Sequence, residues 1–186
     1  CYPLLQMRPA TLHFLCLSGL IAMACTAGAQ SASAPRTQGT QAKTVHFDGS
    51  STAALVLQAR GKGVQIYICM KDADWSWKLK APEATLFDQH GKAIGKHFAG
   101  PTWRLNDGSE VQGKVLEVRQ QPGTIPWLIV AAHPTGGPGR LSHVDVVRRI
   151  DTRGGSAPSS GCDATHAGAE VRVPYSATYS FFDTKK

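Results

Sequence analysis

The sequence predicts an all-β fold, an antiparallel sandwich or barrel of about nine or ten short strands, and three observations support this. Turn-forming residues are frequent, with 19 glycines and 11 prolines among 186 residues. Apolar and polar side chains alternate over many short runs, which is the period of a strand with one buried face. No amphipathic stretch of helical length competes with these runs.

The first half of the domain is expected to hold strands separated by turns. A turn at residues 61–63 is predicted between two extended runs, 52–59 and 64–70. Residues 75–80 alternate apolar with polar side chains, which predicts a strand whose tryptophans and leucine share one dry face. Further strands are expected over residues 83–87, 93–98, 101–105 and 111–118, with hairpin turns at 88–91 and 106–109 and a possible bulge at Gly113.

The second half is more apolar. Residues 125–133 form a nearly continuous apolar run, which predicts a strand buried on both faces. A loop rich in proline and glycine follows at residues 134–139. In residues 144–150 the apolar side chains are predicted to face inward and Arg149 outward. Residues 171–182 alternate again and form a candidate last strand that closes the sheet.

The N-terminus is typical of a secretory signal peptide over residues 1–29, with its true start expected at Met7. A basic start precedes a short apolar run, and residues 27–29 match a small-residue cleavage site. The run is too short for a membrane span, so we expect no transmembrane segment in the mature chain. Two alternatives remain: a lipoprotein in which Cys25 is the acylated residue, and a buried N-terminal helix.

The remaining chain divides into a flexible leader and one domain. Residues 30–43 are polar and lack apolar periodicity. Residues 44–186 then form a single all-β domain of ordinary size. With a signal peptide in front of it, this domain is expected to be periplasmic or secreted.

Cysteine usage predicts one disulfide bond. Removal of the leader leaves Cys69 and Cys162, and two thiols in an oxidising compartment most simply pair with each other. The bond would tether the long segment before the last strand to the strand that carries Cys69. A catalytic thiol is the alternative, whereas two isolated cysteines do not make a zinc site by themselves.

The charge is modestly basic. Without Arg8 of the leader the chain keeps 19 basic against 13 acidic residues, and the basic residues are scattered. Nucleic-acid binding would require a basic stripe with exposed aromatic residues, so we expect no nucleic-acid partner. A cationic protein can instead associate weakly with an anionic envelope polymer, and a simply solvated basic surface is the alternative.

Several segments occur in a recognisable order: residues 63–69, 95–103 with 107–109, 125–128, 161–162 and 173–177. In this order they resemble an exported bacterial and fungal family, domain-of-unknown-function family 3455. The resemblance covers residues 44–182, and it implies export, one domain and the pairing of Cys69 with Cys162. It supplies no activity and no catalytic residues.

The best candidate ligand site is a concave surface bordered by His97, Trp103, Asp107 and Tyr175. Trp103 follows a Gly-Pro step and precedes an arginine, which places it near a loop edge where its ring could stack on a sugar. Core packing is the alternative for each tryptophan. His97, Asp107 and Ser109 also contain the residue types of a hydrolytic triad, but the Asp-Gly-Ser sequence is more simply explained as a hairpin tip.

Histidines offer weak candidates for a metal site. His133 and His143 flank the glycine-rich loop, and a hairpin of residues 125–133 with 141–150 would bring them together. Ordinary surface histidines are the alternative.

We therefore expect a non-catalytic binding or envelope-associated module for a glycan or small polar ligand, without a cofactor. One alternative is a metal-dependent or hydrolytic enzyme that uses His97 and His133. Another is a structural or stress protein that binds no ligand.

Overall fold

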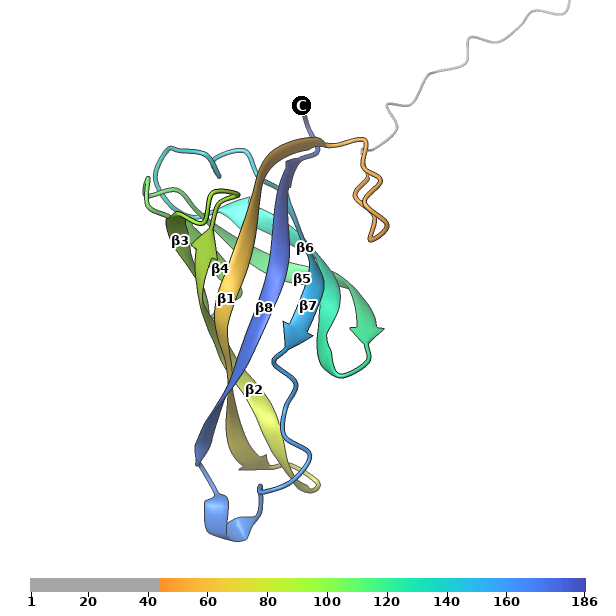
Figure 1. The fold of residues 1–186 in the computed structure, drawn as a ribbon, viewed down its shortest axis with the longest axis vertical. Helices are drawn as coiled ribbons and strands as arrows, with labels where there is room; N and C mark the ends of the chain where they lie inside the picture. The colour runs from red at the N-terminus through yellow and green to blue at the C-terminus, as the bar shows by residue number, and fades with distance from the viewer. Residues whose placement is uncertain (1–43) are drawn as a thin grey trace, which may run out of the picture. The chain divides into compact units, whose positions relative to one another are not determined.

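The computed structural model describes residues 44–186, which form a closed antiparallel barrel of eight strands (Figure 1). Each strand pairs with the next one along the chain, and β1 (Ala54–Lys71) pairs with β8 (Glu170–Asp183) to close the ring. The all-β class is thus confirmed, in its barrel form. The strands between these two are β2 (Trp75–Phe87), β3 (Ala93–Phe98), β4 (Thr102–Leu105), β5 (Glu110–Gln121), β6 (Thr124–Pro134) and β7 (Val146–Gly154).

The signal peptide predicted over residues 1–29, the lipoprotein alternative at Cys25 and the leader over residues 30–43 lie outside the described residues. Within residues 44–186, no helix has the length and apolar character that a membrane crossing requires. The one helical turn there is a short 3₁₀ helix, Ala164–His166, between β7 and β8.

The barrel has fewer and longer strands than the sequence predicted, because the expected turn at residues 61–63 lies inside β1. Gly61 and Gly63 are paired with β2 on one side and β8 on the other. A Cβ atom on Gly63 would lie 2.0 Å from the carbonyl oxygen of Glu83, and one on Gly61 would lie 2.6 Å from the ring of Tyr179. These glycines therefore allow close approach of neighbouring groups and do not form a turn.

Two further expectations for the first half are corrected. The runs 75–80 and 83–87 form one strand, β2, and the face expected to be dry is only partly covered, since Leu79 is exposed. Gly113 forms no bulge, because it pairs in register with Ala132. A Cβ atom there would lie 2.4 Å from Val130, so this glycine also makes room for its neighbours.

Large side chains fill the barrel interior. Trp103, Tyr179 and Phe181 are among the most buried, and the two aromatic pairs that Trp103 makes with Tyr179 and Phe181 meet edge to face. Strand β8 contributes four consecutive inward positions, as its alternation predicted: Tyr175, Ala177, Tyr179 and Phe181. An eight-stranded barrel is just wide enough for such side chains to fill it.

A second apolar cluster covers the outside of β6, β7 and β8. Val45 and Phe47, which precede β1, are buried against Ile129 and Phe182, and Trp127 packs beside them. Strand β6 is therefore buried on both faces, as predicted.

This outer layer also explains an error in the predicted facing of β7. Val147 and Arg149 point into the barrel, whereas Val146 and Ile150 pack in the outer cluster. Since apolar residues occur on both faces of β7, their pattern alone gave the wrong inward face.

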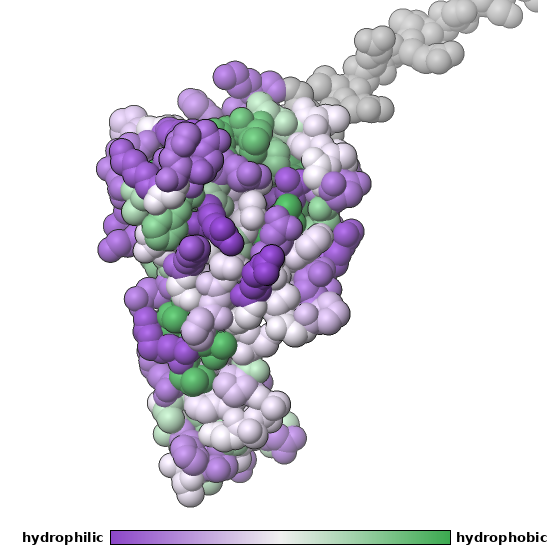
Figure 2. Space-filling model, in the orientation of Figure 1, coloured by the Kyte–Doolittle hydropathy of each residue, from purple (hydrophilic) through white to green (hydrophobic). Residues whose placement is uncertain are grey.

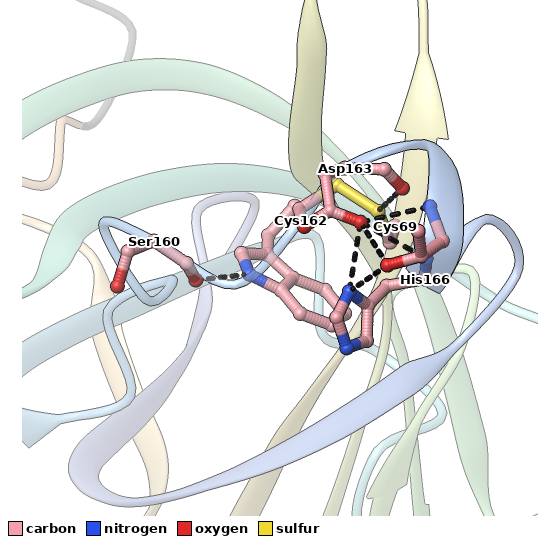
Figure 3. Close-up of a disulfide and its surroundings, with 7 residues drawn as sticks. Cys69, Ser160, Cys162, Asp163 and His166 are labelled. Carbon is pink, nitrogen blue, oxygen red and sulfur yellow. Dashed lines mark hydrogen bonds and ion pairs between the residues drawn. A yellow bond between two sulfur atoms is a disulfide. The ribbon is translucent and has the colours of Figure 1, made fainter.

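The disulfide bond between Cys69 and Cys162 is present and ties the segment between β7 and β8 to β1. Two more contacts hold this segment: the Tyr67 hydroxyl donates to the carbonyl of Gly155 (2.6 Å), and the Trp77 indole donates to that of Ser160 (2.9 Å). Figure 3 shows Asp163 and His166 beside the bridge, where the carboxylate of Asp163 contacts the His166 ring at 2.9 Å.

Replacement of Gly63 tests the close approach in β1. We expect Gly63→Ala to lower the free energy of unfolding by about 1–3 kcal/mol or more, because the new methyl group meets backbone atoms that cannot move freely. Gly137→Ala is the matched control, since its Cβ would have only one atom within 4 Å, at 3.8 Å. Urea denaturation measures both. Equal stability of the two variants would show that the contact at Gly63 is not limiting.

Removal of the disulfide tests its contribution. The bond joins residues 93 positions apart, and closure of a loop of this size stabilises a fold by about 4–5 kcal/mol in the chain-entropy model. We expect the Cys69→Ala/Cys162→Ala variant to lose most of this, measured by urea denaturation against the oxidised wild type. A loss below about 1 kcal/mol would mean that the unfolded chain is already constrained there.

Candidate functional site

Two of the four predicted site residues meet inside the barrel. His97 on β3 and Trp103 on β4 are paired positions, and their rings stack with centroids 4.6 Å apart and planes 10° apart. Each is only 2% exposed. Trp103 does follow directly on the turn before β4, as expected, but its ring lies in the core and is not accessible for stacking on a sugar.

His97 is held as a neutral imidazole. Its Nδ1 lies 2.8 Å from the carbonyl oxygen of Thr102, so this nitrogen carries the proton and donates it. Burial lowers the pKa of His97 to about 3, because the charged form loses its hydration inside the barrel. The hydrogen bond to Thr102 works in the opposite direction but is the smaller effect, and the nearby Arg149 charge lowers the pKa further.

Tyr175, the third predicted residue, belongs to the same interior. Its hydroxyl lies 3.1 Å from that of Tyr179, and the Tyr179 ring is 5.2 Å from His97 between centroids. Burial raises the pKa of both tyrosines above the ordinary value, so both keep their protons. His97, Trp103 and Tyr175 thus belong to one buried aromatic cluster that also contains Tyr179.

Arg149 is the member of this interior that the sequence analysis missed. Its Nε and one terminal nitrogen donate to the carbonyl of Pro126 at 3.1 and 2.8 Å, and no carboxylate pairs with it among the described residues. Its charge lowers the pKa of His97 and opposes the rise at Tyr67, Tyr175 and Tyr179. A buried arginine without a carboxylate is costly, and its hydrogen bonds to the Pro126 carbonyl and with the Tyr179 side chain offset part of that cost.

Asp107, the fourth predicted residue, lies apart at the β4–β5 turn. Its carboxylate accepts hydrogen bonds from the Ser109 backbone (2.9 Å), the Ser109 hydroxyl (2.6 Å) and the Arg140 backbone (2.9 Å). The bond from the Arg140 amide is the largest cause of a lowered pKa at Asp107. Asp107 and Ser109 therefore fix the β6–β7 loop, and the triad of His97 with these two residues is not formed.

That loop reaches a groove with a volume of about 890 Å³. One wall is the first half of β1, and the other is the β2–β3 turn. Three arginine and lysine side chains line it: Arg60, Lys62 and Arg140. None of the three is among the ion pairs formed within residues 44–186. The face over β1 and β8 carries many strongly hydrophilic side chains in Figure 2.

The groove forms where β1 extends beyond its pairing with β2. Pairing between them begins at Arg60 and Phe87, so residues 54–59 pair with β8 alone. The opposite edge of this stretch carries backbone groups that no described strand pairs with. One of them, the carbonyl of Val56, receives a long hydrogen bond of 3.5 Å from the Arg140 guanidinium.

The acidic residue of the groove, Asp88, is already engaged. Its carboxylate accepts from the backbone amides of His90 and Lys92 at 2.9 Å each, and these bonds lower its pKa. It therefore shapes the β2–β3 turn, and the three cations outnumber this one carboxylate among the lining residues, so the groove carries an excess of positive charge.

The two candidate metal ligands do share a pocket. The predicted hairpin of β6 and β7 forms, and His133 and His143 line a hollow of about 200 Å³ together with Asp145 and Asp183. The Asp145 carboxylate is bound by the backbone and hydroxyl of Thr184 at 2.9 and 2.6 Å. Over residues 44–186, no three histidine, cysteine or acidic side chains are grouped so that they could hold a metal ion.

The residues of the groove carry no motif that would have singled them out. Arg60 and Lys62 alternate with buried residues on β1, which is a signal for outward-facing positions, but their meeting with Arg140 depends on a contact 80 residues or so along the chain. The Asp-Gly-Ser sequence predicted that Asp107 lies in a hairpin turn, but it did not predict the hydrogen bond from the Arg140 backbone.

Comparison with known proteins gives one match. A family model described as "Protein of unknown function (DUF3455)" matches residues 49–183, almost the whole of the described barrel. No curated protein and no solved structure matches the chain.

The buried neutral His97 makes a testable contribution to pH dependence. The unfolded chain takes up a proton at this histidine near its ordinary pKa of 6.5, whereas the folded state does so only near 3. The contribution of His97 to the free energy of unfolding is therefore fully present above pH 6.5. It is lost as the pH drops towards 3, by up to about 1.4 kcal/mol per pH unit. Urea denaturation at several pH values in this window measures the free energy of unfolding. We expect this free energy to change less steeply with pH in His97→Phe than in the wild type. Equal slopes would contradict a neutral, buried imidazole.

Proposed function

The chain belongs to the DUF3455 family of proteins of unknown function, and within that family we propose that it is a non-catalytic module that binds an acidic glycan in the groove along β1. The observation that carries this proposal is the set of three cations, Arg60, Lys62 and Arg140, gathered in one groove, none of which forms an ion pair within residues 44–186. We further propose that the protein is exported and meets this glycan, or a similar anionic polymer, in the cell envelope or outside it.

Charge favours an anionic ligand. Every ion pair formed among residues 44–186 uses other basic side chains. The Asp107 carboxylate attracts Arg140 from the neighbouring turn and Asp88 lines the groove, but three cations against these carboxylates leave a net attraction for a carboxylate or sulfate. A cluster of one sign in a concave site strengthens the local field and speeds the approach of an oppositely charged ligand. Arginine also binds a carboxylate through two parallel hydrogen bonds.

The other groups of the groove favour a sugar over a simple ion. The unpaired edge of β1 offers backbone donors and acceptors, and polar side chains such as Gln58, Gln89 and Thr178 add amides and a hydroxyl. Sugar hydroxyls need such partners of both kinds. At about 890 Å³ the groove falls within the range of organic ligand sites and greatly exceeds the space a single ion requires.

The enzyme alternative lacks a comparable observation. His97 is enclosed in the barrel with one ring nitrogen bound to Thr102, and His133 lies in a different hollow. The groove has two candidate bases, and neither hydrogen-bonds to a hydroxyl nucleophile there: the His90 ring contacts the Gln89 amide at 3.1 Å, and the Asp88 carboxylate is bound to backbone amides. A role as a ligand-free structural protein would leave the unpaired cations without an explanation.

Retention on immobilised polygalacturonate tests the groove, with dextran as the neutral polymer. We expect the wild type to bind polygalacturonate and to be released by salt, because exposed charge pairs are screened. Arg60→Gln/Lys62→Gln/Arg140→Gln should weaken binding by roughly tenfold or more, since each exposed charge contact contributes up to about 1 kcal/mol.

The matched control removes the same charge elsewhere. Lys71→Gln/Lys96→Gln/Lys114→Gln changes three exposed residues that do not line the groove. Equal weakening in both triple variants would mean that only net charge matters and would contradict a site in the groove. Shortening of the polymer during the assay would instead favour the enzyme alternative.

A further inference from the structure

The second half of β5 is a strand edge with no neighbour in the part of the chain that the structure describes. β5 pairs with β4 only over residues 110–112, whereas its pairing with β6 continues to Gln121. Residues 114–120 are exposed, so side chains on both faces of this stretch meet solvent. The backbone groups on the free edge are therefore open to another strand.

This edge is also apolar. Val115 is 41% exposed, Leu116 59% and Val118 53%. These three residues are half of the large exposed apolar side chains found across residues 44–186, and they lie within four consecutive positions. An exposed apolar edge strand is a surface to which another strand tends to add.

The comparable free stretch of β2 is protected. It carries Lys78 and Lys80, which form ion pairs with Asp72 and Glu170, and then Pro82. Lysine and proline are the residues that natural sheets use to prevent pairing at an edge. Leu79 on that stretch of β2 and Leu55 at the free start of β1 are single exposed apolar residues, whereas β5 gathers three such residues on one free edge.

The charges of β5 favour a second copy of the same chain. Glu117 and Arg119 flank Val118, and their pairing with Ile129 and Trp127 places both on the outer face of the sheet. The Arg119 guanidinium lies there over the Phe47 ring, 4.5 Å from its centroid, and forms no ion pair within residues 44–186. When two such edges pair antiparallel about Val118, Glu117 of each copy lies opposite Arg119 of the other. Opposite charges at facing positions stabilise a strand pair, and like charges destabilise it.

We propose that two copies of the protein associate through antiparallel pairing of their β5 edges, centred on Val118. The arrangement is two-fold symmetric, as most homodimer interfaces are. Register shifts bound the segment 117–119 on both sides, so the regular pairing is short and the association depends on protein concentration. β5 lies halfway round the eight-stranded ring from β1, so the dimer does not depend on the proposed glycan groove.

Sedimentation velocity of the full chain over a concentration series tests the dimer. We expect a monomer–dimer equilibrium in the wild type. Glu117→Arg alone and Arg119→Glu alone each place like charges opposite one another and should raise the dimer dissociation constant at least about tenfold. Val118→Lys, which puts two lysines at the symmetry axis, should have the same effect.

Restoration of the charge pattern identifies the register. The double variant Glu117→Arg/Arg119→Glu should dimerise again, and an equimolar mixture of the two single variants should form a mixed dimer. Lys114→Glu is the matched control, because it changes the charge as much as Arg119→Glu but faces no charged residue in this pairing. Circular dichroism checks that every variant is folded.

Three outcomes would overturn the proposal. The wild type could remain a monomer at every concentration. The single charge variants could dimerise as well as the wild type does, which would place the interface elsewhere. The double variant could fail to recover, which would exclude the pairing about Val118.

Discussion

The pairing of β1 with β8 is the interaction on which the rest of this structure depends, because it turns an eight-stranded meander into a closed ring. Closure fixes the radius of the barrel and so the volume that side chains must fill. It also brings Gly61 against the ring of Tyr179, where no larger residue has room. The pairing continues to Ile68 and Glu170, next to Cys69, which anchors the β7–β8 segment. One contact between the ends of the sheet thus sets the core, the glycine positions and the tether.

A filled interior moves the candidate site to the outside. Trp103, Tyr179 and His97 occupy space that a wider barrel would leave to a ligand, and their contacts with one another explain why they are buried. Aromatic and histidine side chains are candidate ligand contacts in a sequence because their rings can stack and form hydrogen bonds. The same rings also fill the interior of a narrow barrel. The unpaired cations at the barrel surface are harder to explain by packing, and they carry the functional proposal for that reason.

The sequence could predict what depends on local pattern. Strand alternation in β8 and the hairpin turn at Asp107 are confirmed, because each follows from residue type and short spacing. The pairing of the two cysteines is confirmed as well, because only two thiols remain in the domain. It could not predict the path through Gly61 and Gly63, since a glycine that permits close contact looks the same as one that makes a turn. It also placed Arg149 on the wrong face, because residues 44–53 cover the outside of β7 and remove the polar signal there.

The parts of the candidate site that the sequence did not predict depend on contacts between residues far apart in the chain. Asp107 was selected as a ligand contact, but its carboxylate binds the Arg140 backbone and so holds one cation of the groove in place. The same loop is fixed a second time, since the Ser109 hydroxyl accepts from the amide of Leu141, whose side chain is fully buried. A residue chosen for its own chemistry therefore acts by positioning another. Because the buried end of the loop belongs to the barrel core, the position of Arg140 over β1 follows from the packing that closes the barrel.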